Sequence, residues 1–205
     1  MIAIIDYGVG NLFNLKGSFD FLGIETVVTN EKETVSNASH IVLPGVGAFG
    51  DAAKKLSETG LKDFLVEQAK NGKPFLGICL GMQLLFNKSF EYGVHEGLSL
   101  INGEVVPIID DLPEDKKGLD IPQIGWNALH IENESPLLKY TDEGDCVYFV
   151  HSYYAKTDKE NLIATAQYGI PITAAVQNEN VFGTQFHPEK SGSVGLKMLK
   201  AFSEI

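Results

Sequence analysis

The sequence predicts an α/β fold with a mixed, mostly parallel central sheet flanked by helices. In the first half of the chain, short apolar runs alternate with segments whose apolar residues recur at helical spacing. In the C-terminal half, short strands separated by turns indicate additional antiparallel strands. Because α/β domains often reach the length of this 205-residue chain, we expect residues 1–205 to form a single domain.

The first half contains four expected strands, each followed by a turn or a helix. These strands are predicted over residues 2–5, 24–28, 41–43 and 75–78. Helical patterns cover residues 12–22, 52–57, 61–71 and 80–87, with Gly23 and Gly72 as C-terminal stops. Ligands of parallel sheets bind at the carboxyl ends of the strands. Asp6–Gly8, Pro44–Gly45 and Cys79 are all expected at that edge.

The second half is expected to form short antiparallel strands and one last helix. The strands are predicted over residues 147–151, 163–167, 173–177 and 182–186, with a turn at residues 178–180. The final helix carries Val194, Met198, Leu199 and Phe202. The charged, proline-containing stretch 110–118 is expected to be an exposed loop.

Composition argues against several classes of function. The chain has 16 basic and 27 acidic residues, a formal charge of −11, and no run of lysine and arginine of the kind that neutralises phosphates, which argues against nucleic-acid binding. The N-terminus lacks the basic and long apolar regions of a signal peptide, and no stretch approaches the roughly 18 apolar residues of a membrane span. We therefore expect a cytoplasmic protein that binds neither nucleic acid nor membrane.

Cys79 has the sequence context of a catalytic nucleophile. It lies where an apolar strand runs directly into a helix, with Gly77 and Gly81 two places before and after it. A sharp strand-to-helix turn needs small neighbours, and the helix N-terminus favours a thiolate. A buried structural cysteine is the alternative. The second cysteine, Cys146, opens an apolar run without glycines and is expected in the core.

His187 is the best candidate for the base that a cysteine nucleophile requires. It is expected at the end of a strand, and Pro188 favours extended backbone there. In extended chain, residues i and i+2 project to the same side, so Glu189 is expected to orient the imidazole. Of the other histidines, only His151 follows an apolar strand, and the sequence leaves open whether it contacts the active site.

The glycine-containing segment Pro44–Phe49 is a candidate for stabilising an oxyanion. It follows the third strand and lacks the lysine and hydroxyl residue of a P-loop, which argues against nucleotide binding. Its position allows a backbone N–H to face the Cys79 sulfur.

These motifs resemble those of class I glutamine amidotransferases. GICLGMQLL around Cys79 and TQFHPEKS around His187 are similar to the nucleophile and His-Glu motifs of that family. Within it, Val46, Met82 and the segments IDYGVGN, LPGVGAF, PQIGWN and YFVHSYY resemble glutaminase subunits of imidazole glycerol phosphate synthase. The resemblance extends over almost the whole chain and keeps the order of the motifs.

The resemblance implies hydrolysis of L-glutamine to glutamate and ammonia through a Cys79 thioester. Cys79, His187 and Glu189 would form the catalytic triad, and no metal or cofactor is implied. The oxyanion and substrate would be bound by Gly45, Val46, Gly47, Leu80 and Gln83.

The resemblance also implies a heterodimer with a (β/α)₈-barrel cyclase subunit. That subunit would use the ammonia to make imidazole glycerol phosphate and 5-aminoimidazole-4-carboxamide ribonucleotide (AICAR) in histidine biosynthesis. The interface would include Asn11, Asn14, Trp126, Tyr148 and Lys190. Simpler roles stay open: the asparagines as helix caps, Trp126 as core and Lys190 as a solvated side chain. The family trait of a loop amide turned away until the partner is loaded implies low activity of the isolated chain.

Other functions remain open at this point. One is a paralogous glutaminase that supplies ammonia to surface-sugar amination, or a γ-glutamyl hydrolase with the same nucleophile turn. Another is a binding scaffold derived from a glutaminase that has lost its activity. Such a scaffold usually lacks a triad residue, whereas Cys79, His187 and Glu189 are all present here.

Overall fold

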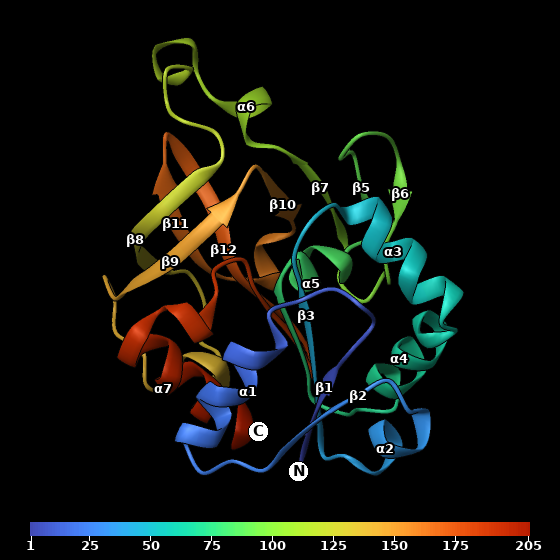
Figure 1. Cartoon of the computed structure of the whole chain (residues 1–205). Coiled ribbons are helices and arrows are strands. Elements are labelled where there is room, and N and C mark those ends of the chain that lie inside the picture. The colour runs from blue at the N-terminus through green and yellow to red at the C-terminus, as the bar shows by residue number, and fades with distance from the viewer.

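The computed structural model describes all 205 residues, and Figure 1 shows them as two sheets with surrounding helices. The α-helices are α1 Leu12–Phe21, α2 Lys32–Asn37, α3 Phe49–Glu58, α4 Leu61–Lys70, α5 Leu80–Leu84, α6 Ile108–Asp111 and α7 Gly192–Ser203. The strands of the large sheet are β1 Ile2–Ile5, β2 Thr26–Thr29, β3 His40–Gly45, β4 Phe75–Cys79, β8 Gln123–Ile131, β9 Cys146–His151, β11 Leu162–Tyr168, β12 Ile170–Asn178 and β13 Val181–Thr184. The smaller sheet contains β5 Lys88–Ser89, β6 His95–Glu96, β7 Gly103–Pro107 and β10 Tyr153–Thr157.

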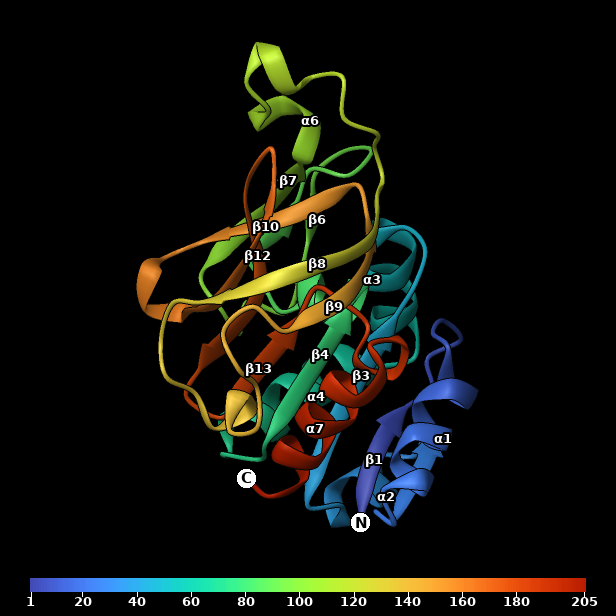
Figure 2. The ribbon, with the colours of Figure 1, turned by 90° about the vertical axis from the view of Figure 1, so that its left-hand side faces the viewer.

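The large sheet is mixed and mostly parallel on the N-terminal side, as the sequence predicts. Its nine strands have the order β2-β1-β3-β4-β13-β12-β11-β8-β9. The strands from β2 to β13 run parallel, and from β13 to β9 each neighbouring pair is antiparallel. Figure 2 shows β4 and β13 side by side in the middle of the molecule. The carboxyl end of β4 therefore lies at the centre of the sheet, where β3 also ends.

Helices cover both faces of the parallel strands, and each face has its own hydrophobic core. One core packs Leu15 and Phe19 of α1 and Phe202 of α7 against Ile4 and Ile78. The other packs α2, α3 and α4 against the opposite side of the same strands, with fully buried residues such as Phe49, Leu65 and Phe75. The runs of β1 and β4 are apolar at every position because both faces are buried.

The small sheet, with the order β10-β7-β5-β6, was not predicted from the sequence. Two of its strands have only two residues each, which is too short for an alternating pattern to be visible. Beyond β7, the chain projects from the top of the molecule in Figure 1. Residues 110–118 of this projection are largely exposed, as expected, but include the end of α6 and a 3₁₀ turn at Glu114–Lys116.

Several boundaries differ from the sequence prediction. The helix after Cys79 ends at Leu84, because the carbonyls of Leu84 and Leu85 accept hydrogen bonds from Leu98 and Leu100 instead of from the next helical turn. Strand β3 continues through Gly45, and β2 begins two residues later than expected. Helix α2 and strand β8 were not predicted.

The prediction that Cys146 lies in the core is wrong. Its side chain is exposed because β9 alternates, with Val147, Phe149 and His151 facing inward and Cys146 on the opposite side. No helix of the structure is sufficiently long and apolar to span a membrane.

Candidate active site

Cys79 forms the sharp turn between β4 and α5. Its backbone has φ 54° and ψ −111°, a strained conformation for a residue other than glycine. The side chain is buried, with 7% of its surface exposed. Such a turn projects the sulfur from the end of the strand beside the first N–H groups of the following helix.

Gly77 and Gly81 make this turn sterically feasible. A Cβ atom on Gly77 would lie 2.6 Å from the carbonyl oxygen of Gly81. A Cβ atom on Gly81 would lie 1.8 Å from the carbonyl oxygen of Leu43 in the neighbouring strand. The flanking glycines therefore permit close backbone contact, as the sequence predicted.

His187 and Glu189 lie side by side. The Nδ1 atom of His187 is 2.8 Å from Oε1 of Glu189, and both side chains are 3% exposed. The route to this pairing differs from the prediction, because β13 ends at Thr184 and His187 lies three residues beyond it. Glu189 approaches the ring through a 3₁₀ turn at Pro188–Lys190 rather than through extended chain.

The backbone of His187 is fixed by contacts to β9. Its N–H donates to the carbonyl of Tyr148 at 3.0 Å, and its carbonyl accepts from the hydroxyl of Ser191 at 2.7 Å. The Ser191 oxygen also accepts from the Tyr148 N–H at 3.0 Å. This network locks the turn that carries His187 and Glu189 to the sheet.

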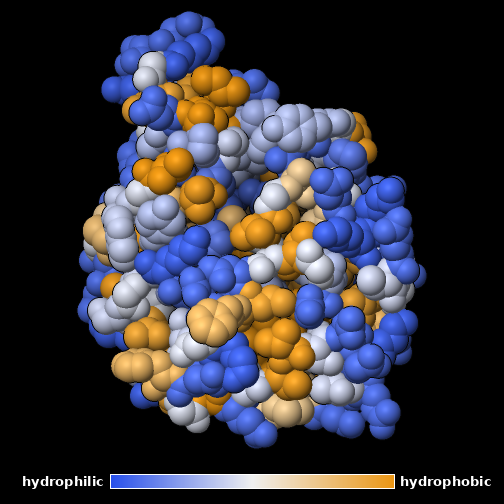
Figure 3. Space-filling model, in the orientation of Figure 1, coloured by the Kyte–Doolittle hydropathy of each residue, from blue (hydrophilic) through white to orange (hydrophobic).

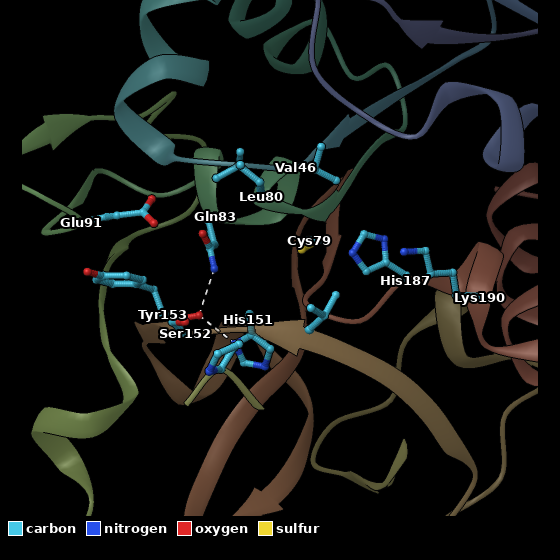
Figure 4. Close-up of a pocket in the computed structure, with 13 residues that line it drawn as sticks. Val46, Cys79, Leu80, Gln83, Glu91, His151, Ser152, Tyr153, His187 and Lys190 are labelled. Atoms are coloured by element: carbon cyan, nitrogen blue, oxygen red, sulfur yellow. Dashed lines mark hydrogen bonds between the residues drawn. The ribbon is translucent and has the colours of Figure 1, made fainter. Parts of the chain in front are cut away.

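The surroundings favour a protonated His187. Burial by itself lowers the pKa of the imidazole, but interactions with the Cys79 sulfur and the Glu189 carboxylate outweigh it and raise the pKa to about 10. With the carboxylate accepting from Nδ1, the other ring nitrogen remains available toward Cys79, beside which the ring lies in Figure 4. The arrangement suits a cysteine nucleophile with an imidazole that delivers and removes protons.

Cys79 and His187 share one cavity of about 340 Å³. Its lining comes from both halves of the chain: Val46, Gly47, Cys79, Leu80, Gln83, Glu91, Pro122, Val150, His151, Ser152, Tyr153, His187 and Lys190. Figure 4 shows Glu91 and Tyr153 on one side of Cys79 and His187 with Lys190 on the other. The cavity is large enough for a small molecule such as an amino acid.

The family model of class I glutamine amidotransferases matches residues 3–204. The chain belongs to this family. It is 48% identical over 206 residues to the imidazole glycerol phosphate synthase subunit HisH of Caldanaerobacter subterraneus subsp. tengcongensis, covering all of this chain and 98% of that one. The proteins of the same name from Syntrophotalea carbinolica and Wolinella succinogenes are 45% and 44% identical, with full coverage of both chains.

Solved structures share the fold of this amidotransferase. A crystal structure of a glutamine amidotransferase superimposes with a TM-score of 0.76 at 17% identity, covering 100% and 98% of the two chains. PurLQS from Thermotoga maritima gives a TM-score of 0.73 at 20% identity, with 99% and 97% covered. The full-length identity to the HisH proteins places the chain among the glutamine amidotransferase subunits of imidazole glycerol phosphate synthase.

The predicted oxyanion and substrate residues of this amidotransferase lie around Cys79, with one exception. Val46, Gly47, Leu80 and Gln83 line the cavity, whereas Gly45 is buried in β3 directly opposite Cys79. The side-chain amide of Gln83 donates to the carbonyl of Tyr153 and to Oε1 of Gln185, each at 3.0 Å. These bonds hold Gln83 rigidly against the cavity wall.

Sequence reasoning missed two side chains that complete the site. Gln185 is fully buried, and its amide donates to the Cys79 sulfur at 3.8 Å while its oxygen accepts from Gln83. Its place two residues before His187 was the only available signal. Glu91 brings a carboxylate to the cavity from the loop between β5 and β6, and nothing in its local sequence distinguished it from a surface acid.

His151 does line the site, which the sequence left open. Its Nδ1 atom bonds the carbonyl of Tyr153 at 2.8 Å, and its Nε2 atom is buried without a partner. Burial lowers its pKa to about 4, with the nearby His187 adding to the shift. His151 is therefore a neutral imidazole at physiological pH, whereas the surroundings of His187 favour its protonated form.

Of the predicted interface residues, Trp126 and the two asparagines do not adopt the simpler roles considered for them, whereas Lys190 is exposed, as a solvated side chain would be. Trp126 is 55% exposed rather than core, and its ring packs edge-on against Tyr148 at 6.0 Å. The Lys190 ammonium lies 5.8 Å from the centre of the Tyr148 ring and lines the cavity. Asn11 precedes α1 without a capping hydrogen bond from its side chain, and the Asn14 side chain is exposed.

Proposed function

We propose that the chain hydrolyses L-glutamine through a Cys79 thioester and passes the ammonia to a (β/α)₈-barrel cyclase subunit. That partner would form imidazole glycerol phosphate and AICAR in histidine biosynthesis. The carrying observation is the shared cavity in which Cys79, at a strained strand-to-helix turn, faces a His187 paired to Glu189 at 2.8 Å. The full-length similarity to HisH proteins supports the choice of pathway. We also propose that residues 1–205 act as one amidotransferase domain in the cytoplasm.

In the first half of the reaction, the Cys79 thiolate attacks the carbon of the glutamine side-chain amide. The electron pair of the C=O bond moves to oxygen, and the backbone N–H groups of Gly47 and Leu80 are the proposed donors to that oxyanion. The protonated His187 then delivers a proton to the amide nitrogen, so that ammonia leaves as the C–N bond breaks. Glu189 keeps the ring oriented throughout.

In the second half, His187 is a base. It removes a proton from the water that attacks the thioester, and the tetrahedral intermediate collapses to glutamate and the Cys79 thiolate. The buried position of His187 and Glu189 keeps bulk water from competing for the same protons.

The far end of the cavity suits the amino-acid part of the substrate. The Glu91 carboxylate is the proposed acceptor for the α-ammonium group of glutamine. A hydrogen bond between two oppositely charged groups is stronger than one between neutral groups. Gln83, held by Tyr153 and Gln185, is the proposed wall against which the side chain of glutamine lies.

Trp126, Tyr148 and Lys190, together with Asn11 and Asn14, are proposed to face the cyclase subunit. Trp126 and Tyr148 are neighbours across β8 and β9, and the ammonium of Lys190, which lines the cavity, lies over the Tyr148 ring. Figure 3 shows a central band of apolar residues on one face of the molecule, flanked by polar residues. Exposed apolar surface of this kind is typical of protein interfaces. The isolated chain is proposed to have low activity because Val46 and Gly47, which make no hydrogen bonds of their own, leave a loop amide turned away from the oxyanion until the partner is loaded.

Covalent labelling tests the chemistry directly. A glutamine-like electrophile should add one equivalent to the wild-type chain, and peptide mass spectrometry should place it on Cys79. Cys79→Ser should not be labelled, and Cys146→Ser, which removes the exposed cysteine, should be labelled normally. Labelling elsewhere, or glutamate release by Cys79→Ala, would exclude the proposed nucleophile. The alternative, supply of ammonia to surface-sugar amination, is not favoured by any observation in the structure.

A further inference from the structure

The loop that follows β3 is held at its start by Tyr7. The Tyr7 hydroxyl donates to the carbonyl of Pro44 at 2.9 Å, and this contact is buried. The neighbouring strand β1 pairs with β3 only as far as Ile4 opposite Val42, so it offers no donor to Pro44. A buried carbonyl needs a donor, and the phenol supplies it from beyond the end of β1.

Tyr7 is itself firmly placed. Burial raises the pKa of its phenol, and the nearby Cys79 adds to the shift, so the hydroxyl stays a donor. A Cβ atom on Gly45 would lie 2.8 Å from the Tyr7 oxygen and 2.9 Å from the Gly81 nitrogen. The phenol therefore packs into the same junction as the Cys79 turn.

Glu91 holds the other end of the loop. Its carboxylate accepts from the N–H of Phe49, the first residue of α3, at 2.5 Å. The donor lies at a helix N-terminus, which favours the negative charge. Glu91 lines the cavity as well, so the same carboxylate contacts the loop and faces the bound molecule.

Between these two anchors, the loop is free of internal restraint. Neither Val46 nor Gly47 makes a hydrogen bond, and a Cβ atom on Gly47 would meet no other atom within 4 Å. Val46 is 42% exposed and Gly47 has φ 93°. Their peptides have no contacts of their own, so the nearest fixed points are the anchored ends of the loop.

We propose that Tyr7 and Glu91 clamp the two ends of the loop Gly45–Ala48 and thereby direct its N–H groups toward the bond that Cys79 attacks. Tyr7 is a positioning residue, acting through the Pro44–Gly45 peptide, and Glu91 couples loop position to occupancy of the cavity. This inference rests on the proposed glutaminase function. It assigns to Tyr7 a role that depends on its hydroxyl rather than on its ring.

The test compares Tyr7→Phe with Tyr154→Phe in the chain bound to its barrel partner. Tyr154 is also a buried tyrosine whose hydroxyl donates to a side chain, but it lies in a separate cluster with Ile108 and Leu112. In Tyr7→Phe the Pro44 carbonyl loses its hydrogen-bond donor, and we expect the Pro44–Gly45 peptide to rotate. The variant should therefore lower kcat for glutamate release about tenfold, with KM changed less than about twofold. Alkylation of Cys79 by iodoacetamide, which forms no oxyanion, should keep its rate. Tyr154→Phe should match wild type in all three measurements.

Two Glu91 variants test the second anchor. Glu91→Gln and Glu91→Ala both lose the charge, but only the glutamine keeps an oxygen that can accept from Phe49 N–H. We expect kcat of Glu91→Ala to be about tenfold below that of Glu91→Gln. Equal kcat values in the two would overturn the second anchor.

Other outcomes distinguish a failure of the Tyr7 clamp from a failure of the proposed glutaminase function. An unchanged kcat in Tyr7→Phe, or a parallel loss of kcat and alkylation rate, would overturn the role of Tyr7. A wild-type complex that releases no glutamate would refute the proposed function instead. In that case a crystal structure of Tyr7→Phe decides the clamp: a turned Pro44 carbonyl supports it, and an unmoved loop overturns it.

Discussion

The Nδ1 atom of His187 lies 2.8 Å from Oε1 of Glu189, and His187 lines the same cavity as Cys79. The second oxygen of Glu189 is buried without a partner. His187 is therefore the only hydrogen-bond partner of this carboxylate. This pairing makes the contribution of Glu189 measurable by a single substitution.

Glu189→Gln should lower kcat for glutamate release by roughly a hundredfold, because a neutral amide no longer fixes the tautomer or stabilises the protonated ring. KM for glutamine should stay close to the wild-type value, since Glu189 does not line the cavity. Steady-state kinetics of the complex with its partner measure both constants. A kcat within about twofold of wild type would show that His187 does not depend on Glu189.

The raised pKa of His187 predicts how stability depends on pH. Because the pKa in the folded state is about 10 and the unfolded value is near 6.5, the stabilisation is fully present below about pH 6.5 and is lost as the pH rises toward 10. The free energy of unfolding from denaturant titrations should therefore fall between about pH 7 and 10. His187→Asn should flatten this slope. An unchanged slope in that variant would assign the pH dependence to other groups.

Gly81→Ala should destabilise the fold by about 3 kcal/mol or more, because its Cβ atom would lie 1.8 Å from the Leu43 carbonyl oxygen and the backbone must move. Gly17→Ala is the matched control. Gly17 lies within α1 with no atom near its Cβ position, so alanine should be neutral or stabilise by up to about 1 kcal/mol. Thermal unfolding of both variants measures the difference. Equal melting temperatures would contradict the close contact at the Cys79 turn.

Glu91→Gln should raise KM for glutamine by about tenfold, because the proposed partner of the α-ammonium group loses its charge. A substrate analogue without that ammonium group should bind wild type and variant equally well. Competition by such an analogue in the glutaminase assay provides the comparison. If the variant weakens both ligands to the same extent, Glu91 acts through the loop alone.

The sequence was informative where local chemistry decides the structure. Cys79 lies between two glycines at the junction of an apolar strand and a helix, a pattern that is typical of a sharp turn. The structure confirms this turn. The parallel strand runs are apolar on both faces and were likewise recognisable. The pairing of His187 with Glu189 was predicted correctly, and His187 is extended as expected, but a 3₁₀ turn at Pro188–Lys190 replaces the extended chain expected between the two residues.

Features that depend on distant contacts could not be predicted. Glu91 reaches the cavity only because the small sheet folds over the start of α3, and that sheet contains strands of two residues. The end of α5 is set by hydrogen bonds to Leu98 and Leu100, more than a dozen residues away. Cys146 was misplaced because the side of an alternating strand that faces the core depends on its neighbours in the sheet.

The most direct test of the central claim is glutamate release from glutamine by the purified chain, alone and with a histidine-pathway cyclase and its ligand. We predict weak release by the chain alone, an increase of at least about a hundredfold in the loaded complex, and complete loss of both in Cys79→Ala. The same release rate with and without the loaded cyclase would contradict the proposed partnership. Glutamate release that persists in Cys79→Ala would contradict the mechanism itself.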